Sequence, residues 1–183
     1  MSRNRVRIIG GAWRSRLITF PHRPDLRPTP DRVRETLFNW LGQDLTGRIC
    51  LDLFAGSGAL GFEAASRGAQ RVAMVERDPV VFRALAANRG LLRAEAVELA
   101  RSDALEFLRH DDGVYDVVFL DPPFDAGYWP RLAPLLPQRL AAGAMVYHEG
   151  RTRTEPAIDW EVCKESRAGQ VTSQLFRRTE TKP

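Results

Sequence analysis

The sequence predicts an α/β fold: a seven-stranded, mostly parallel sheet covered by helices on both faces, with a small β-hairpin before it. Three observations lead to this prediction. From residue 48 onward, short apolar runs alternate with helix-like segments, as in sheets whose parallel strands are joined by helices. The first of these runs leads through a glycine-rich turn into a helix-like segment. Before residue 30, two strand-like runs flank a Gly-Gly pair, and prolines follow them.

The N-terminal residues are predicted to form a hairpin and an extended connector. Residues 5–9 and 16–20 alternate or run apolar around the Gly-Gly pair, which indicates two paired strands with outward-pointing arginines. The prolines that follow restrict their own backbone and that of the preceding residue. We therefore expect residues 1–30 to be a basic N-terminal unit and residues 31–183 to be the main domain.

The first helix of the main domain is predicted from Asp31. Thr29 is expected to cap this helix, with Pro30 in its first turn, where a missing N–H is tolerated. Apolar side chains recur at helical spacing along one face of it: Val33, Leu37, Trp40 and Leu41.

Strands and helices then alternate along the chain. The strands are expected near residues 48–54, 71–76, 97–102, 115–120, 144–148, 161–164 and 172–178. The helices are expected at residues 59–67, 79–92 and 104–110, the second of them capped by Asp78. Prolines break residues 128–140 into short helical pieces. At 183 residues, the chain is long enough for one domain to bury most of its apolar surface.

The most specific chemical motif follows the strand at residues 115–120. It is Asp121-Pro122-Pro123-Phe124, placed at the carboxyl edge of the sheet, where open α/β folds bind their ligands. The Asp121 carboxylate and the Pro122 carbonyl can accept the two hydrogens of an exocyclic amine on a flat base, and Phe124 can stack on that base. The alternative is a plain turn after a core strand, with Phe124 filling the core.

The glycine-rich turn is a second candidate site. Gly56, Gly58 and Gly61 match the G-x-G-x-x-G spacing of dinucleotide sites, although this match alone is weak. Asp52 precedes the turn, and its carboxylate would repel a pyrophosphate but can hold a cationic group. The alternative role for Asp52 is a strand-end cap.

Two further acids end the next two strands. Glu76 lies 24 positions after Asp52, where an acidic side chain can accept both hydroxyls of a ribose. Asp103 could accept from an adenine amino group, but as the N-cap of the helix that follows it needs no ligand. Both readings of Asp103 remain open.

Positive charge is concentrated at the N-terminal end. The formal net charge is +4, yet residues 1–34 carry nine arginines against two aspartates, so this segment is net +7 and the rest is net −3. A basic unit beside a mildly acidic body suits an enzyme with a polyanionic substrate, because phosphates are neutralised next to the site. The arginines that we expect to contact such a substrate are Arg3, Arg5, Arg7, Arg14, Arg16, Arg27, Arg32 and Arg34.

Other classes of site find little support. Two cysteines and three scattered histidines give neither a disulfide framework nor the spacing of metal ligands. No apolar run reaches membrane-spanning length, and the N-terminus lacks the apolar core of a signal peptide. We expect a cytoplasmic protein without a bound metal.

Taken together, the motifs resemble class I S-adenosylmethionine-dependent methyltransferases that act on exocyclic nitrogens. The resemblance rests on the segment from Asp52 to Gly61, on Glu76 and on the Asp-Pro-Pro-Phe motif. Within that superfamily, residues 7–16 and 27–41 are similar to the RsmD type, whose members methylate the N2 amine of one guanine in 16S ribosomal RNA. The resemblance covers nearly the whole chain and is thin after about Tyr128.

This resemblance implies a Rossmann-like fold with an antiparallel last strand. It also implies S-adenosyl-L-methionine as cofactor and 16S rRNA as substrate, either naked or within an assembled small ribosomal subunit, for a protein that we expect to be a monomer. The catalytic candidates are Asp121, Pro122, Pro123 and Phe124. The cofactor candidates are Thr29, Asp52, Phe54, Ala55, Gly56, Ser57, Gly58, Glu76, Asp103 and Ala104.

Three alternative functions compete with this one. A DNA adenine N6-methyltransferase would use the same Asp-Pro-Pro-aromatic motif, but the chain has no second domain large enough to read a DNA sequence. A nicotinamide-dependent oxidoreductase is disfavoured by Asp52, and a nonenzymatic RNA-binding module leaves the tetrapeptide without a role. The choice of guanine over adenine rests on the resemblance and not on a residue.

Overall fold

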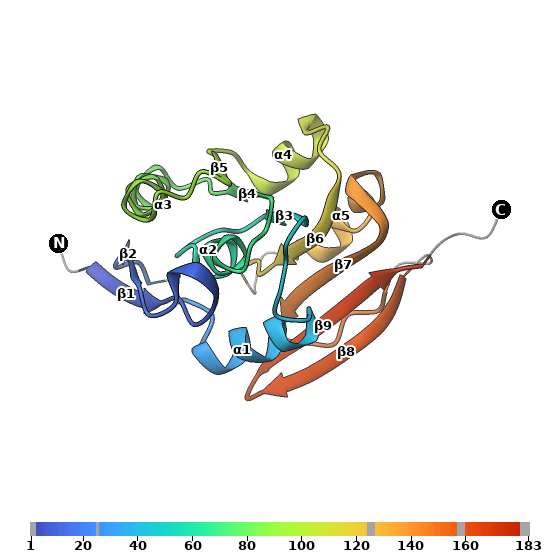
Figure 1. Ribbon diagram of the computed structural model, residues 1–183. Coiled ribbons are helices and arrows are strands. Elements are labelled where there is room, and N and C mark those ends of the chain that lie inside the picture. Colours follow the sequence, from blue (N-terminus) through green and yellow to red (C-terminus); the bar gives the residue numbers. More distant parts are fainter. Residues whose placement is uncertain (1–2, 25, 124–126, 157–159, 180–183) are drawn as a thin grey trace.

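The computed structural model describes residues 3–24, 26–123, 127–156 and 160–179, and it has two sheets (Figure 1). A small sheet pairs β1 (Arg3–Arg7) with β2 (Leu17–Pro21) in antiparallel orientation, with the short 3-10 helix η1 (Gly11–Trp13) between them. The second sheet has seven strands in the order β5-β4-β3-β6-β7-β9-β8. The predicted fold class, including the N-terminal hairpin, is confirmed.

The seven strands and the helices between them follow the predicted alternation closely. The strands are β3 (Ile49–Asp52), β4 (Arg71–Val75), β5 (Val97–Ala100), β6 (Tyr115–Leu120), β7 (Leu140–Gly150), β8 (Trp160–Ala168) and β9 (Val171–Arg178). The helices are α1 (Asp31–Trp40), α2 (Ala59–Ser66), α3 (Pro79–Leu92), α4 (Ala104–His110), α5 (Trp129–Leu132) and the 3-10 helix η2 (Leu136–Arg139). The last two are the short helical pieces expected among the prolines.

The order of the strands creates a switch point between β3 and β6. The chain runs outward from β3 through β4 to β5, then returns to the other side of β3 and continues with β6 and β7. These five strands are mutually parallel, whereas β9 is antiparallel to both β7 and β8, which confirms the expected antiparallel last strand. Open α/β sheets bind ligands outside the carboxyl ends of the strands at such a point.

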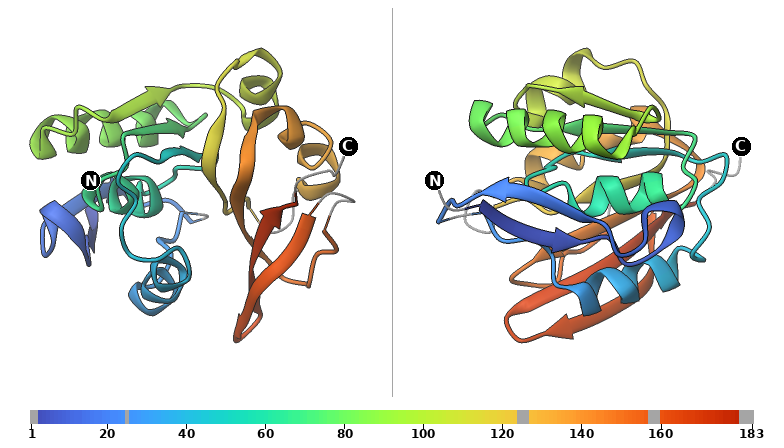
Figure 2. Two further views of the ribbon diagram at one scale, coloured as in Figure 1. Left: turned by 45° about the vertical axis from the view of Figure 1, so that its right-hand side comes forward. Right: turned by 60° about the vertical axis from the view of Figure 1, so that its left-hand side comes forward.

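Two apolar layers cover the seven-stranded sheet. One contains buried side chains of α1, α2 and α3 and also of the hairpin, so that Val6, Ile8, Ile18 and Phe20 belong to the core of the large sheet. The other contains side chains of α4, α5 and η2. Figure 2 shows the hairpin lying against α2, on the side of the sheet away from α4. The hairpin therefore shares its core with the main domain.

The predicted start of α1 was wrong in one respect. Pro30 itself occupies the N-cap position, and no side chain caps this helix. Thr29 instead donates its hydroxyl to Asp121 Oδ2 at 3.3 Å. The connector thus turns Thr29 toward the edge of the sheet, and its side chain binds a residue 92 positions away rather than the first turn of its own helix.

Candidate active site at the carboxyl edge of the sheet

Acidic residues project from one face of the sheet at its carboxyl edge. Side chains alternate along a strand, so a residue two positions after a core residue lies on the same face. Cys50, Met74, Phe119 and Tyr147 all belong to the core under α1 to α3. Two positions after them stand Asp52, Glu76, Asp121 and Glu149. The four strands β3, β4, β6 and β7 therefore present their acids toward the same helical layer.

Asp52 is the deepest of these acids. Its side chain is buried, and Oδ2 accepts a hydrogen bond from the backbone N–H of Gly61 at 2.9 Å, in the first turn of α2. Burial raises the pKa of Asp52 to about 7, and the nearby carboxylates of Asp121 and Glu76 add to the rise, while the Gly61 N–H opposes it. The strand-end role is thus present, and a cation would stabilise the ionised form of this buried carboxylate.

The glycine turn has a backbone conformation that other residues adopt only rarely. Gly56 and Gly58 have φ values of +50° and +84°, and Gly58 is the N-cap of α2. A Cβ on Gly58 would lie 2.6 Å from the Phe62 ring, and a Cβ on Gly61 would lie 2.7 Å from the sulfur of Met74. Gly61 therefore allows α2 to pack closely on β4, while Gly56 and Gly58 shape the loop above the sheet.

Glu76, which directly follows β4, connects that strand to the glycine turn. Its Oε2 accepts from the Gly56 N–H at 3.1 Å, and its Oε1 accepts from the Asp78 N–H at 2.7 Å. Asp78 caps α3 as predicted, since its Oδ1 accepts from Val80 N–H at 2.7 Å and from Val81 N–H at 3.1 Å. Each carboxylate oxygen has a second lone pair, so Glu76 keeps acceptor capacity for a ligand hydroxyl.

Asp103 is the N-cap of α4. Its Oδ1 accepts from the Leu105 N–H at 2.9 Å and from the Glu106 N–H at 3.4 Å. The capping role of Asp103 is confirmed, and its contact with an adenine stays a prediction.

The Asp-Pro-Pro segment leaves the sheet where the motif placed it. Asp121 follows the end of β6 directly, beside the switch point, and accepts the hydroxyl of Thr29. Burial raises the pKa of Asp121 to about 6, and the Thr29 hydroxyl opposes that rise. Pro122 is buried and Pro123 is exposed, whereas Phe124 lies outside the described residues.

Glu149 was missed in the sequence. The parallel register pairs Leu120 with His148, so the next residues of the two strands, Asp121 and Glu149, are neighbours. Glu149 Oε1 accepts the hydroxyl of Tyr147 at 2.6 Å. Burial and, to a lesser extent, the nearby Asp121 carboxylate raise the pKa of Glu149 to about 8, while the Tyr147 hydroxyl opposes the rise. The signal was an acid at the end of an apolar strand, the same pattern that identified Asp52 and Glu76, but the predicted strand stopped one residue short.

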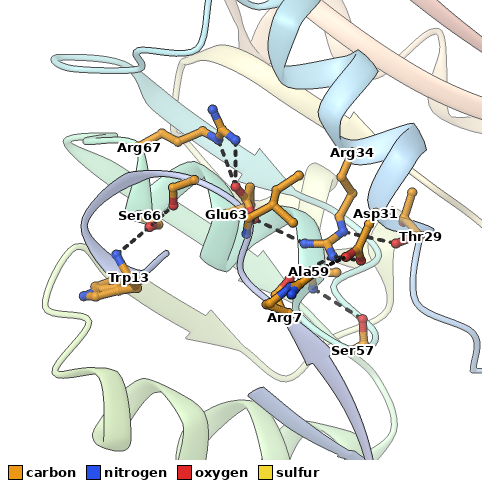
Figure 3. A network of polar contacts seen from close by, with 12 residues as sticks. Arg7, Trp13, Thr29, Asp31, Arg34, Ser57, Ala59, Glu63, Ser66 and Arg67 are labelled. Atoms are coloured by element: carbon orange, nitrogen blue, oxygen red, sulfur yellow. Dashed lines mark hydrogen bonds and ion pairs between the residues drawn. The ribbon is translucent and has the colours of Figure 1, made fainter. Parts of the chain in front are cut away.

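One predicted RNA contact, Arg34, is wrong. Its side chain is completely buried, and it forms ion pairs with Glu63 at 3.2 Å and with Asp31 at 2.6 Å. Its Nε and Nη2 donate to the carbonyls of Thr29 and Arg7 at 3.1 and 2.8 Å. Figure 3 shows this guanidinium between α1, α2 and the hairpin. Arg34 therefore holds the connector and the hairpin in place and cannot reach a polyanion.

The same network fastens the turn of the hairpin to α2. Glu63 Oε2 accepts from the Ile9 N–H at 2.9 Å, and Ser66 Oγ accepts from the Trp13 N–H at 2.9 Å (Figure 3). Arg67 binds the other oxygen of Glu63 and lies 4.7 Å from the centre of the Phe38 ring. The basic N-terminal unit is thus attached to the helix that begins at the glycine turn.

Six of the other predicted RNA contacts are exposed: Arg5, Arg7, Arg14, Arg16, Arg27 and Arg32. The side chain of Arg3 lies outside the described part. A hollow of about 600 Å³ between the hairpin and the connector is lined by Arg5 and Arg27 and also by Arg23, which the prediction omitted. Arg23 pairs with Asp78 at 3.5 Å, so the connector reaches the edge where Glu76 lies.

The described residues contain neither a metal site nor a membrane span. Within residues 3–24, 26–123, 127–156 and 160–179, no three His, Cys, Asp or Glu side chains are grouped so that they could hold a metal ion. No helix in the same ranges is long and apolar enough to cross a membrane.

The donor set suits the cofactor that the resemblance implies. Asp52 offers a buried carboxylate to a cationic group, and Glu76 offers acceptors to ribose hydroxyls. The interacting carboxylates of Asp52, Glu76 and Asp121 would oppose a pyrophosphate. The glycine spacing therefore fits a nucleoside with a positively charged substituent better than a dinucleotide.

Comparison with known proteins gives consistent matches. The model of the family described as "Conserved hypothetical protein 95" matches residues 6–177. The chain is 43% identical over 179 residues to "Ribosomal RNA small subunit methyltransferase D" of Escherichia coli (strain K12), covering 94% of this chain and 90% of that protein.

Solved structures agree with this match. A putative methyltransferase, yhhF, from Escherichia coli has a TM-score of 0.88 and 41% identity, covering 97% of this chain and 100% of that one. An RNA methyltransferase from Salinibacter ruber, solved in complex with S-adenosyl-L-homocysteine, has a TM-score of 0.67 and 22% identity, covering 86% and 97%. At that identity the second likeness concerns the fold alone.

Proposed function

The chain belongs to the RsmD-type methyltransferase family, described as "Conserved hypothetical protein 95", and from this premise we propose that it transfers a methyl group from S-adenosyl-L-methionine to the N2 amine of a guanine in 16S rRNA. The observation that carries the proposal is the position of Asp121. It stands at the end of β6, across the switch point from the buried Asp52 and the glycine turn. Donor and acceptor sites are therefore neighbours.

Three groups of residues support S-adenosyl-L-methionine as donor. Asp52 and the loop from Phe54 to Gly58 would hold the methionine half, Glu76 the ribose, and Asp103 with Ala104 the adenine. The Salinibacter ruber RNA methyltransferase, which shares the fold, is described in complex with S-adenosyl-L-homocysteine, the demethylated form of this cofactor. When bound, S-adenosyl-L-methionine supplies an electrophilic methyl group on a positively charged sulfur.

The residues of the chain then have to orient the amine. The Asp121 carboxylate and the Pro122 carbonyl accept its two hydrogens, which keeps the lone pair available for the methyl carbon. Thr29 fixes the orientation of Asp121 through its hydroxyl. No strong base is required beforehand, because the nitrogen becomes acidic only after it gains the methyl group. Phe124 remains our candidate for stacking on the base.

An rRNA substrate is supported by the name of the Escherichia coli relative and by the exposed arginines of the N-terminal unit. The guanine N2 position rests on the family resemblance. The amine of a stacked, paired guanine is inaccessible, so the target base has to be unpaired or flipped out. Such a substrate would place the enzyme in the cytoplasm. The DNA adenine alternative is not favoured, since the curated relatives of high identity are named for ribosomal RNA.

The proposal can be tested in an Escherichia coli strain that lacks its own relative. Mass spectrometry of nucleosides from 16S rRNA should show one N2-methylguanosine fewer in that strain, and expression of this chain should restore it. Expression of the Asp121→Ala variant should not restore it. If the wild-type chain leaves the rRNA unchanged but adds N6-methyladenine to DNA, the DNA alternative is correct.

A further inference from the structure

Glu149 is a buried acid beside Asp121 that has no role in the proposed reaction, whereas Asp121 binds the amine. The register of β6 and β7 makes them neighbours at the carboxyl edge. Glu149 is only 5% exposed, and the hydroxyl of Tyr147 that binds it is completely buried. Ser173 of β9 supports that hydroxyl at 3.2 Å. Burying a carboxyl group beside a second carboxyl group costs free energy when no cation compensates, so a functional reason for the arrangement is worth seeking.

The groups around this pair offer little positive charge. Asp52 of β3 interacts as a like charge with Asp121 and with Glu76, which directly follows β4. On β7, burial lowers the pKa of His148 to about 4, so this imidazole is neutral at pH 7.

On the α1 side, Thr29 offers only a hydroxyl, and Arg34 is committed to Glu63 and Asp31. Among the residues that the structure describes, no ion pair joins Asp121 or Glu149 to a cation.

A buried carboxyl group, Glu149, and a half-buried one, Asp121, that are neighbours without a cation cannot both be ionised at little cost. Burial raises the pKa of Asp121 to about 6, and burial together with the neighbouring Asp121 carboxylate raises that of Glu149 to about 8. The pair therefore carries one proton at pH 7, and it titrates as a unit. The missing positive charge is what a sulfonium would supply.

We propose that Asp121 and Glu149 form a proton-holding pair that loses its proton when a sulfonium binds and regains one from the methylated amine. This inference rests on the proposed function, because it requires S-adenosyl-L-methionine as the donor. Asp121 is the catalytic member, since it contacts the amine. Glu149 acts through Asp121 and is a positioning residue for charge and proton.

The step balances in atoms and charge. The bond between the methyl carbon and sulfur breaks with its electron pair left on sulfur, and the amine lone pair forms the new nitrogen–carbon bond. The nitrogen then carries a positive charge and gives one proton to the ionised pair, which returns to its initial state. Over the cycle one proton leaves the protein, and it leaves when the donor binds.

Calorimetry of the full chain tests this inference without any methyl transfer. Binding enthalpies measured at pH 7 in buffers of different ionisation enthalpy give the number of protons released. Binding of S-adenosyl-L-methionine should release about one proton more than binding of S-adenosyl-L-homocysteine. The two ligands share the amino group that faces Asp52, so any proton that Asp52 releases cancels in the difference. Only the sulfonium charge distinguishes them.

The pH dependence of affinity should follow the same rule. Because the sulfonium binds the deprotonated pair, affinity for S-adenosyl-L-methionine should rise with pH, by up to about tenfold per unit, and level off above the pKa of about 8 of Glu149. Affinity for S-adenosyl-L-homocysteine, whose amino group can draw a proton only from Asp52, should level off at lower pH, above the pKa of about 7 of that residue.

The Glu149→Gln variant distinguishes a proton-holding role of Glu149 from a merely structural role. The amide keeps the shape and can still accept the Tyr147 hydroxyl, but it cannot release a proton, so the extra proton release should disappear. Comparing the variant with the wild type for the same ligand also cancels any titration of the ligand itself. Glu161→Gln, an exposed acid on β8, is the matched control and should leave the proton release unchanged.

The outcomes are distinguishable. Equal proton release for the two ligands in the wild-type protein overturns the inference, even if Glu149→Gln fails to fold. Extra release that persists in Glu149→Gln also overturns it. If neither ligand binds, the proposed function fails as well.

Discussion

Asp121 lies between two other groups of the site: the Thr29 hydroxyl donates to its carboxylate, and the strand register places Glu149 of β7 next to it. Replacing Asp121 with alanine removes one of the two acceptors for the amine while leaving the glycine turn and Glu76 intact. We expect kcat for methylation of rRNA to fall about 100-fold or more, as when one preorganised polar group is lost from an active site. Affinity for S-adenosyl-L-homocysteine should stay within about tenfold, since that ligand lacks the charge that Asp121 faces.

Transfer of a labelled methyl group to rRNA measures the first quantity, and calorimetry the second. Asp112→Ala is the control, because this carboxylate is fully exposed. An Asp121→Ala variant that methylates like the control would remove Asp121 from the reaction.

Some of the site residues could be predicted from the sequence and others could not. Asp52, Glu76 and Asp121 could be identified because each ends an apolar run, and their positions along a parallel sheet follow from that alone. Arg34 could not be identified as buried, because its partners Glu63 and the Arg7 carbonyl come from other elements. Among nine arginines near the N-terminus, nothing local distinguishes the one that is enclosed.

At the scale of elements, α1, α2 and the hairpin depend on the buried Arg34–Glu63 pair. Arg34→Met leaves the Glu63 carboxylate buried with less compensation, so the free energy of unfolding should fall by about 3–5 kcal/mol. Urea denaturation measures this change.

Adding Glu63→Gln to Arg34→Met should recover part of the loss, because the unpaired charge is then removed. Arg32→Met, on the exposed side of the same helix, should change stability by less than about 0.5 kcal/mol. If Arg34→Met and Arg32→Met lower the free energy of unfolding by similar amounts, the buried Arg34–Glu63 pair contributes no more to stability than an exposed arginine does.

Most elements could be predicted because the apolar runs and their caps are local signals. The start of α1 was misjudged because the connector ends in Thr29-Pro30, a pattern typical of helix caps, while a distant carboxylate competes for the threonine hydroxyl. The inward face of α1 also differed, since it carries Arg34 and Phe38 beside Leu37. A buried arginine interrupts the apolar spacing by which the buried face of a helix is predicted from sequence.

At the scale of the whole molecule, the basic hairpin is fixed to the same helix that begins at the glycine turn. RNA bound by the hairpin would therefore be held in a defined position relative to the site. Neutralising Arg5, Arg14, Arg27 and Arg32 together should lower RNA affinity. It should also reduce the slope of log affinity against log salt, by about 0.7 to 0.9 for each phosphate that the variant no longer neutralises.

The control for this experiment is a set of four exposed arginines from the rest of the chain: Arg109, Arg153, Arg167 and Arg177. Fluorescence anisotropy with an rRNA fragment at several salt concentrations gives the slope of log affinity against log salt for each variant. Equal slopes for the two four-arginine variants would mean that the N-terminal unit is not the RNA-binding surface.

The arrangement of the whole molecule was only partly accessible from the sequence. Alternating strands and helices predicted the parallel part of the sheet, and the antiparallel end followed from the family resemblance. The docking of the hairpin did not follow, because it depends on contacts such as Ile9 to Glu63 and Trp13 to Ser66, across more than fifty residues. The division at residue 30 stays a prediction, although the two parts share one core.

A crystal structure of the protein with S-adenosyl-L-homocysteine tests the central claim most directly. The account predicts the amino group of the ligand beside Asp52, its ribose hydroxyls within hydrogen-bond distance of Glu76, and its sulfur facing Asp121 across the switch point. A ligand bound elsewhere, or bound with its sulfur turned away from Asp121, would contradict it.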